Sequence, residues 1–201
     1  SRRQRQMCIR DRFGAKQNFK TSLKMQAFYT CFMKFCLALN SYRLREKGDR
    51  IMNMKQLCAK EALKYIKDGM CIGLGGGSTI GYLAEYLAKE ERKITVVTPS
   101  DDTAELCKNL GLMVLSLEMT AHINIAFDGC DELDKELNAL KANGAIHTKE
   151  KIIASMAEKY VLLIDESKFY DTLPLKDSVT LEVIPQSRNY VQAQIEKLGG
   201  K

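Results

Sequence analysis

The feature that most constrains the fold of this chain is a regular alternation of short apolar runs with longer amphipathic segments from residue 52 onward. Short apolar runs bounded by turn residues are typical of buried strands, and apolar residues spaced three and four apart are typical of helices. The predicted strands are Met70–Leu74, Ile94–Thr98, Leu112–Leu117, Ile123–Phe127 and Tyr160–Ile164. The predicted helices are Asn53–Lys67, Ser78–Lys89 (with Ser78 as its cap), Asp101–Asn109 and Lys149–Lys159.

This alternation predicts an α/β fold, a Rossmann-like parallel sheet with helices on both faces. In such sheets ligands bind beyond the carboxyl ends of the strands, where the connecting loops converge. Functional residues are therefore expected at the junctions that follow residues 74, 98, 127 and 164.

The first of these junctions is a glycine-rich loop, GLGGGST at residues 73–79, between a strand and a helix. Glycine permits a close approach of backbone to ligand, and the free N–H groups and positive dipole end of a helix suit a phosphate. Neither nucleotide fingerprint fits, because Ser78 stands where G-x-G-x-x-G needs glycine and the lysine of a Walker loop is missing. The loop predicts a phosphate site of a non-nucleotide type, although a tight turn that binds nothing would also explain it.

Acidic and basic residues follow the fourth predicted strand. Asp128, Asp131 and Glu132 lie at the mouth of that strand, where carboxylates are unfavourable unless they are solvated or paired with ligand hydroxyls. Lys141 comes next along the chain, before a small and flexible segment. Glu150 falls in the first turn of a predicted helix, whose dipole stabilises a carboxylate as the anion. Taken alone, Glu150 is more simply an ordinary acid at a helix terminus.

Taken together, these groups supply what an aldose–ketose isomerisation requires. A carboxylate base removes the proton α to a carbonyl, and a cation or a pair of N–H groups stabilises the enediolate oxygen. A second acid or base opens the sugar ring. This chemistry needs no metal and no redox cofactor, so no cofactor is expected.

Four ordered segments resemble the motifs of ribose-5-phosphate isomerase of the A type. GLGGGST, FDGCDE, LKANGAIHTKEKIIASMA and LLIDESK are similar to the family forms GxGTGST, DGADE, KGGGAALxREKxxA and a late Asp/Glu-x-Ser/Thr-Lys. The similarity runs from about Lys55 to Gly200. It implies interconversion of D-ribose 5-phosphate and D-ribulose 5-phosphate in the non-oxidative pentose phosphate pathway.

The resemblance also implies roles for individual residues. Glu150 is implied to be the general base that moves a proton between C1 and C2, and Lys141 to stabilise the enediolate with the backbone of 142–144. Asp128 is implied to assist ring opening, and Asp131 to bind sugar hydroxyls. The implied substrate-binding residues, with the phosphate held by the glycine loop and two lysines, are Lys55, Gly76, Gly77, Ser78, Thr79, Asp128, Gly129, Cys130, Asp131, Lys141, Ala142, Asn143, Gly144 and Lys168.

Several positions depart from the family pattern. Gly76 stands where the family commonly has threonine, which removes a hydroxyl near the phosphate but leaves the backbone donors. Ala142 and Asn143 replace two glycines, so we expect a crowded oxyanion site or a different backbone path there. Cys130 replaces alanine and is close to it in size.

The two ends of the chain fall outside the regular pattern. Residues 1–51 hold 13 Lys and Arg against 3 Asp and Glu, whereas residues 52–201 hold 18 against 22. We interpret residues 1–51 as an atypical basic extension, either non-native, with Met52 or Met54 as the natural start, or with a role of its own. Residues 52–201 are the predicted catalytic core. The core is expected to be partial, because the family continues into a small α+β lid domain that is missing here.

Composition limits the expected partners and location. The mildly acidic core does not favour nucleic acid, and the apolar run Ala27–Leu39 is shorter than the ~20 residues that span a bilayer. Seven scattered cysteines without a C-x-x-C pair, and two histidines, argue against disulfides and structural zinc. We expect a cytoplasmic protein with a small sugar-phosphate ligand. The resemblance implies a homo-oligomer, either a dimer or a tetramer.

Two other readings of the core remain open. One is a non-catalytic sugar-phosphate sensor of the same fold, as in the effector domains of some bacterial repressors. The joint presence of Asp128, Lys141 and Glu150 favours the enzyme over this sensor, and no helix-turn-helix is legible in residues 1–51. The other is a relative of the coenzyme A transferases, which would need a catalytic Glu on a differently placed loop.

Overall fold

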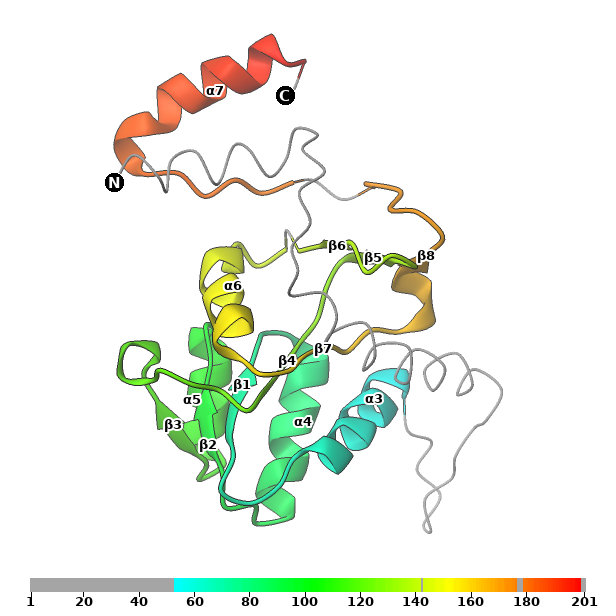
Figure 1. Ribbon diagram of the computed structural model, residues 1–201, viewed down its shortest axis with the longest axis vertical. Coiled ribbons are helices and arrows are strands. Elements are labelled where there is room, and N and C mark those ends of the chain that lie inside the picture. The colour runs from blue at the N-terminus through cyan, green and yellow to red at the C-terminus, as the bar shows by residue number, and fades with distance from the viewer. Residues whose placement is uncertain (1–52, 142, 177–178, 200–201) are drawn as a thin grey trace.

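The computed structural model describes residues 53–141, 143–176 and 179–199 (Figure 1). The basic extension predicted for residues 1–51 lies outside the described residues, so its boundary with the core stays a prediction. Ala142 also lies outside them. Within the described part of the chain, no helix has the length and apolar character needed to cross a membrane.

A five-stranded sheet forms the centre of the fold, in the order β3-β2-β1-β4-β7. Every pair of neighbouring strands in it is parallel. Because the order reverses between β1 and β4, the loops that follow these two strands leave on opposite sides and open a crevice between them. The strands are β1 (Cys71–Leu74), β2 (Thr95–Val97), β3 (Met113–Leu115), β4 (Ile125–Asp128) and β7 (Tyr160–Leu162).

Helices cover both faces of this sheet, as the sequence predicted (Figure 1). Alternate residues of the strands point to opposite faces. Ile72 and Phe127 pack in the core cluster beneath three helices, whereas Ala126 packs with Ile153 of a fourth helix on the other face. The first three helices are α3 (Met54–Ala62), α4 (Ser78–Lys89) and α5 (Asp101–Asn109), and the fourth is α6 (His147–Met156).

A second, smaller sheet in the order β6-β5-β8 was not predicted. Its strands are too short to give a periodic signal: β5 (Glu132–Asp134), β6 (Ala139–Leu140) and β8 (Phe169–Tyr170). Four single turns of 3₁₀ helix and a last α-helix complete the described elements. They are η1 (Leu63–Tyr65), η2 (Leu117–Met119), η3 (Glu166–Lys168), η4 (Pro185–Ser187) and α7 (Arg188–Lys197), the last of which lies away from the large sheet (Figure 1).

Buried carboxylates in β5 hold this small sheet in place. Glu132 is 1% exposed and accepts hydrogen bonds from the backbone N–H groups of Leu175 and Lys176, at 2.8 and 2.6 Å. Asp134 accepts from the backbone of Glu136 and from both the backbone and side chain of Asn138. These N–H groups therefore supply the hydrogen bonds that each carboxylate loses when it is removed from water.

The predicted elements differ from the observed ones mainly at their ends. Helix α5 has the predicted bounds, whereas α6 begins two residues earlier than predicted, at His147. The predicted cap at Ser78 is wrong, because Gly77 is the N-cap of α4, with φ +93°, and no side chain caps that helix. The missing cap leaves the first N–H groups of α4 without side-chain partners from the cap position.

Gly73 gives a direct test of how closely α6 approaches the sheet. A Cβ atom at Gly73 would lie 2.6 Å from Ala126 Cβ and 2.7 Å from Ile153 Cγ2. We expect Gly73→Ala to lower the free energy of unfolding by about 1–3 kcal/mol, because the added methyl overpacks this contact.

The matched control is Gly81→Ala, within α4. Its added Cβ would lie at an ordinary 3.6 Å from Leu106 Cδ2, and alanine favours a helix, so we expect about 0.5–1 kcal/mol of stabilisation. Urea unfolding followed by circular dichroism measures both variants. A Gly73→Ala chain as stable as the unmodified one would contradict the observed packing.

Candidate active site

A pocket of about 510 Å³ opens at the carboxyl ends of β1, β2 and β4, where the strand order reverses. Its walls come from the segments that follow β1, β2, β4 and β7 and from the segment that joins β6 to α6. The lining residues are Gly76, Gly77, Pro99, Ser100, Asp101, Asp102, Asp128, Gly129, Cys130, Asp131, Lys141, Asn143, Gly144, Ile146, Lys149, Glu150 and Lys168.

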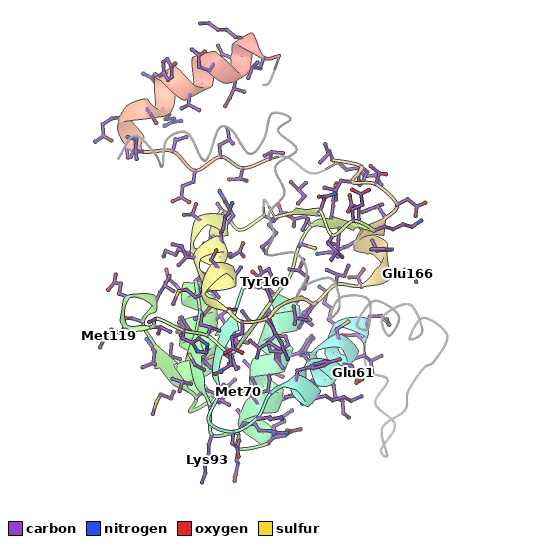
Figure 2. All side chains as sticks on the ribbon, in the orientation of Figure 1. Glu61, Met70, Lys93, Met119, Tyr160 and Glu166 are labelled. Carbon is purple, nitrogen blue, oxygen red and sulfur yellow. The ribbon has the colours of Figure 1, made fainter. Side chains whose placement is uncertain are left out.

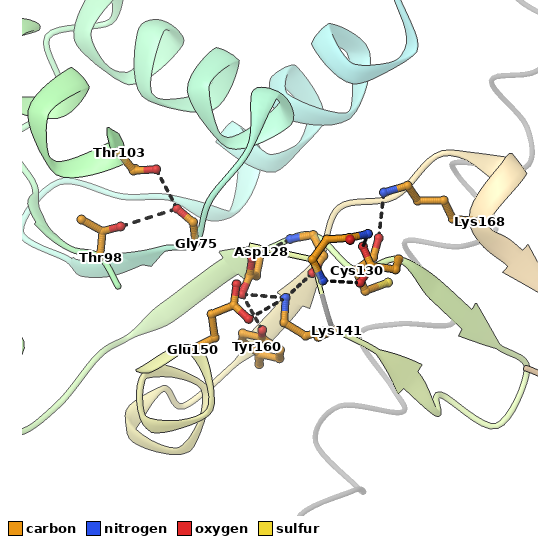
Figure 3. A network of polar contacts seen from close by, with 12 residues as sticks. Gly75, Thr98, Thr103, Asp128, Cys130, Lys141, Glu150, Tyr160 and Lys168 are labelled. Atoms are coloured by element: carbon orange, nitrogen blue, oxygen red, sulfur yellow. Dashed lines mark hydrogen bonds and ion pairs between the residues drawn. The ribbon is translucent and has the colours of Figure 1, made fainter. Parts of the chain in front are cut away.

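Gly75 shapes the glycine loop by allowing β4 to approach it. Its N–H donates to the carbonyl of Phe127 at 2.8 Å, and its own carbonyl accepts from the Thr103 hydroxyl at 2.9 Å (Figure 3). A Cβ atom at this position would lie only 2.0 Å from Oδ1 of Asp128. Glycine is therefore required here for the Asp128 carboxylate to occupy its place at the end of β4.

The loop ends in the N-terminus of α4, which faces the pocket through Gly76 and Gly77. The first N–H groups of a helix and its positive dipole end attract an anion. Lys55 adds a positive charge nearby, because its Nζ donates to Ser78 Oγ at 3.0 Å. This end of the pocket is suited to bind a phosphate group.

Asp128 is buried and accepts three hydrogen bonds or ion pairs (Figure 3). Its Oδ1 accepts from the N–H of Gly129 at 2.8 Å. Its Oδ2 accepts from the Tyr160 hydroxyl at 2.9 Å and pairs with Lys141 Nζ at 3.1 Å. These donors fix the orientation of the carboxylate.

Lys141 joins Asp128 to Glu150. Its Nζ lies 3.3 Å from Oε2 of Glu150 and also donates to the carbonyl of Gly129. The side chains of Asp128 and Glu150 are 4% and 8% exposed, and that of Lys141 is 21% exposed. The ammonium therefore lies between two buried carboxylates and remains accessible from the pocket.

The pKa of Glu150 is raised above its ordinary value. Burial is the largest cause, because it disfavours the charged carboxylate, and the negative charge of Asp128 acts in the same direction. Lys141 opposes both effects through its charge and its hydrogen bond. The balance gives Glu150 a stronger affinity for protons than a solvated carboxylate has, which suits a general base.

Asp131 is held by the residue that replaces a family glycine. The backbone N–H of Asn143 donates to Asp131 Oδ2 at 3.1 Å, and its side-chain amide donates to Oδ1 at 2.7 Å. An oxyanion that used the Asn143 N–H would therefore have to displace Asp131. Gly144 follows with φ +86°, a conformation that glycine adopts readily.

The turn after β4 also carries Cys130 and positions a second lysine. Lys168 Nζ donates to the carbonyl of Cys130 at 2.8 Å (Figure 3). Burial raises the pKa of the Cys130 thiol to about 12, so the thiol stays protonated and acts as an apolar side chain. Its packing against Leu133 and Leu162 supports the turn from below.

The structure brings most of the predicted site residues together. The pocket contains Glu150, Lys141 and the Asp128–Asp131 turn, with Gly76, Gly77, Asn143, Gly144 and Lys168 on its walls. Lys55, Ser78 and Thr79 are not among the lining residues. Within the described part of the chain, no group of three or more His, Cys, Asp or Glu side chains is arranged to hold a metal ion.

Sequence reasoning missed Tyr160, which contacts Asp128 without lining the pocket, and several residues of the pocket wall. Tyr160 was counted only as an apolar strand residue, and its hydroxyl was the signal that could have singled it out. The segment Pro99–Asp102 follows β2 and was marked only as a junction. Ile146 and Lys149 lie at the start of α6, which was predicted to begin two residues later than it does.

Two family models match the chain in different parts. Ribose 5-phosphate isomerase A (phosphoriboisomerase A) matches residues 95–201, which include the whole Asp128–Lys168 region. The DeoR C-terminal sensor domain matches residues 51–117, which include the glycine loop. The sensor match ends before Asp128.

Individual relatives extend the similarity over the glycine loop as well. The chain is 39% identical to ribose-5-phosphate isomerase A of Trichodesmium erythraeum and 42% identical to that of Francisella tularensis subsp. novicida, in each case over 74% of this chain. It spans 65% and 66% of the length of these curated relatives.

A solved structure of D-ribose-5-phosphate isomerase in complex with phospho-erythronic acid has a similar fold. Its TM-score to this chain is 0.68 at 38% sequence identity, over 73% of this chain and 67% of that one. The fold, the ordered motifs and a family match over more than half of the sequence agree. The chain belongs to the ribose 5-phosphate isomerase A family.

Proposed function

We propose that this protein interconverts D-ribose 5-phosphate and D-ribulose 5-phosphate through an enediolate, in the non-oxidative pentose phosphate pathway. The observation that carries the proposal is the contact of Lys141 with both Asp128 and Glu150, at 3.1 and 3.3 Å, inside one pocket. Proton transfer next to a carbonyl requires a base and an electrophilic group, and here a carboxylate can supply the first and the ammonium the second.

Glu150 is the proposed general base. Its carboxylate would remove a proton from one of the two carbons, C1 or C2, and return it to the other. Its raised pKa makes it a better proton acceptor than an ordinary carboxylate. The burial that raises the pKa also keeps bulk water from exchanging the proton during the transfer.

The other groups of the network have complementary proposed roles. Lys141 would stabilise the negative oxygen of the enediolate, because its ammonium reaches into the pocket. Asp128 would assist opening of the furanose ring as an acid or base. Asp131, on the pocket wall, would bind sugar hydroxyls.

The phosphate is proposed to bind at the N-terminus of α4. Backbone N–H groups of 76–79 would donate to it, with Lys55 and Lys168 supplying positive charge from two sides. The complex of a similar isomerase with phospho-erythronic acid, a phosphorylated ligand, supports a phosphate-binding site in this fold.

The second candidate is a sugar-phosphate sensor without catalysis. The match of the DeoR sensor domain to residues 51–117 favours a shared mode of phosphate binding. That match does not include Asp128, Lys141 or Glu150, and a sensor has no need of a base with a raised pKa. The isomerase is therefore the preferred function.

We also propose that the protein acts in the cytoplasm as a homo-oligomer, a dimer or a tetramer. Buried thiols at Cys107 and Cys130, which form no disulfide among the described residues, support a reducing compartment. The proposed oligomer rests on the family resemblance alone.

Replacing the base tests the proposed reaction. In the full-length protein we expect Glu150→Gln to lower kcat by at least about 1000-fold, because the amide cannot accept the proton. Substrate should still bind with a Kd within about threefold, since the phosphate contacts remain. Turnover is measured by conversion of ribose 5-phosphate without added metal, and Kd by calorimetry.

The control for this substitution is Glu158→Gln. Glu158 lies just after α6, is 55% exposed and pairs with His122 at the surface. This variant should keep full activity. Full activity of Glu150→Gln would contradict the assigned base, whereas ribose 5-phosphate binding without turnover in the unmodified protein would favour the sensor.

The pH dependence follows from the raised pKa of Glu150. The base is active only when ionised, so kcat/KM should fall as the pH drops through this pKa, which lies above the ordinary 4.5. Initial rates over a series from about pH 4.5 to pH 8 locate this acid limb. An activity that stays level down to pH 4.5, while circular dichroism shows a folded protein, would contradict the assignment.

The phosphate contacts can be tested separately. We expect Lys55→Met to raise KM about 10-fold or more with a much smaller effect on kcat, because one charge-assisted contact to the phosphate is lost. Lys60→Met removes another exposed lysine from the same helix and should leave both constants unchanged. Equal effects of the two substitutions would show that Lys55 acts only through the net charge.

A further inference from the structure

Tyr160 touches the catalytic network, yet none of the roles above uses it. It is the first residue of β7 and pairs with Ala126 in β4, next to the strand end that carries Asp128. Its ring packs against two apolar clusters, one of which contains Ile153 of α6 (Figure 2). Its hydroxyl donates to Asp128 Oδ2 at 2.9 Å (Figure 3).

We propose that Tyr160 is a positioning residue, which fixes the Asp128 carboxylate so that Lys141 remains shared between Asp128 and Glu150. This inference rests on the proposed isomerase function for its kinetic consequences. Its electrostatic consequence, an effect on the proton affinity of Glu150, can be measured whether or not the protein turns over ribose 5-phosphate.

The geometry around Asp128 shows why a second donor to Oδ2 matters. On the other oxygen, Oδ1 accepts from Gly129 and lies against Gly75, so the carboxylate cannot swing toward the loop. Oδ2 receives both the Tyr160 hydroxyl and the ammonium of Lys141. Without the hydroxyl, the charge on Oδ2 would draw Lys141 closer to Asp128 and away from Glu150, 3.3 Å distant.

A tyrosine hydroxyl is a suitable donor here because it carries no charge. Burial, together with the charges of Asp128 and Glu150, raises the pKa of Tyr160, so the hydroxyl stays protonated throughout the working pH range. A second lysine at this place would stabilise Asp128 but would also lower the pKa of Glu150. The neutral donor stabilises Asp128 and leaves the base strong.

Removal of the hydroxyl should therefore raise the pKa of Glu150 further. The titratable groups that act on this carboxyl come from three elements besides α6: Asp128 and Asp131 around the end of β4, Lys141 after β6, and Tyr160 through Asp128. Asp128 already raises this pKa. Without the hydrogen bond from the Tyr160 hydroxyl, the negative charge of Asp128 is less well stabilised, and its repulsion of ionised Glu150 increases.

The test is Tyr160→Phe in the full-length protein, because phenylalanine keeps the packed ring and loses only the hydroxyl. We expect the acid limb of kcat/KM to move up by about 0.5–1 pH unit. We also expect kcat to fall by about 3- to 10-fold with KM within about twofold, the effect of one lost hydrogen bond to a charged group.

The control is Tyr82→Phe. Tyr82, on α4, also packs against the core, but the polar partner of its hydroxyl is Asn53 at the N-cap of α3 and not a carboxylate of the pocket. In Tyr82→Phe, the acid limb of the kcat/KM profile and the value of kcat should not change. In an Asp128→Asn background, the effect of Tyr160→Phe should largely disappear, because the hydroxyl acts through the carboxylate. An undiminished effect in that background would overturn the proposal.

A direct titration separates this proposal from the proposed function. The side-chain carboxyl carbon of Glu150 can be followed by NMR in the unmodified protein and in Tyr160→Phe. An upward shift of its pKa in the variant supports the positioning role even if no ribose 5-phosphate is converted. An unchanged pKa together with an unchanged acid limb would overturn it.

Discussion

The pocket depends on the ammonium of Lys141, which lies between two buried carboxylates. Asp128 and Glu150 are both buried, and two ionised carboxylates in a medium of low dielectric constant would repel each other strongly. Lys141 contacts both of them, and its charge makes the pair tolerable. The glycine loop and the start of α6 line the same pocket around Lys141. Each of them brings backbone N–H groups and the positive end of a helix dipole to it.

The sequence predicted the large sheet well because its strands and helices are strongly periodic. Helix α5 has its predicted bounds, and Asp128 lies at the end of a strand of the large sheet, where the sequence predicted an acidic residue. The small sheet was missed, because strands of two or three residues carry no periodic pattern. Tyr160 was missed for another reason: an apolar pattern does not distinguish a ring that only packs from one whose hydroxyl reaches a charge.

The two family matches divide the pocket along its chemical roles. The part matched by the sensor domain contains the glycine loop, whose proposed phosphate contacts come mostly from backbone N–H groups. The part matched by the isomerase model contains Asp128, Lys141 and Glu150, the side chains proposed for catalysis. The residues proposed for phosphate binding and for catalysis thus come from different stretches of chain, which are brought together where β1 pairs with β4.

The contact of Gly75 with Asp128 ties these two stretches together. The carboxylate occupies the volume in which any side chain at position 75 would begin. A phosphate loop taken from another protein could therefore be grafted onto this scaffold only if it also lacked a side chain at that point. The glycine loop and the acidic strand end therefore constrain each other sterically, although they follow different strands of the sheet.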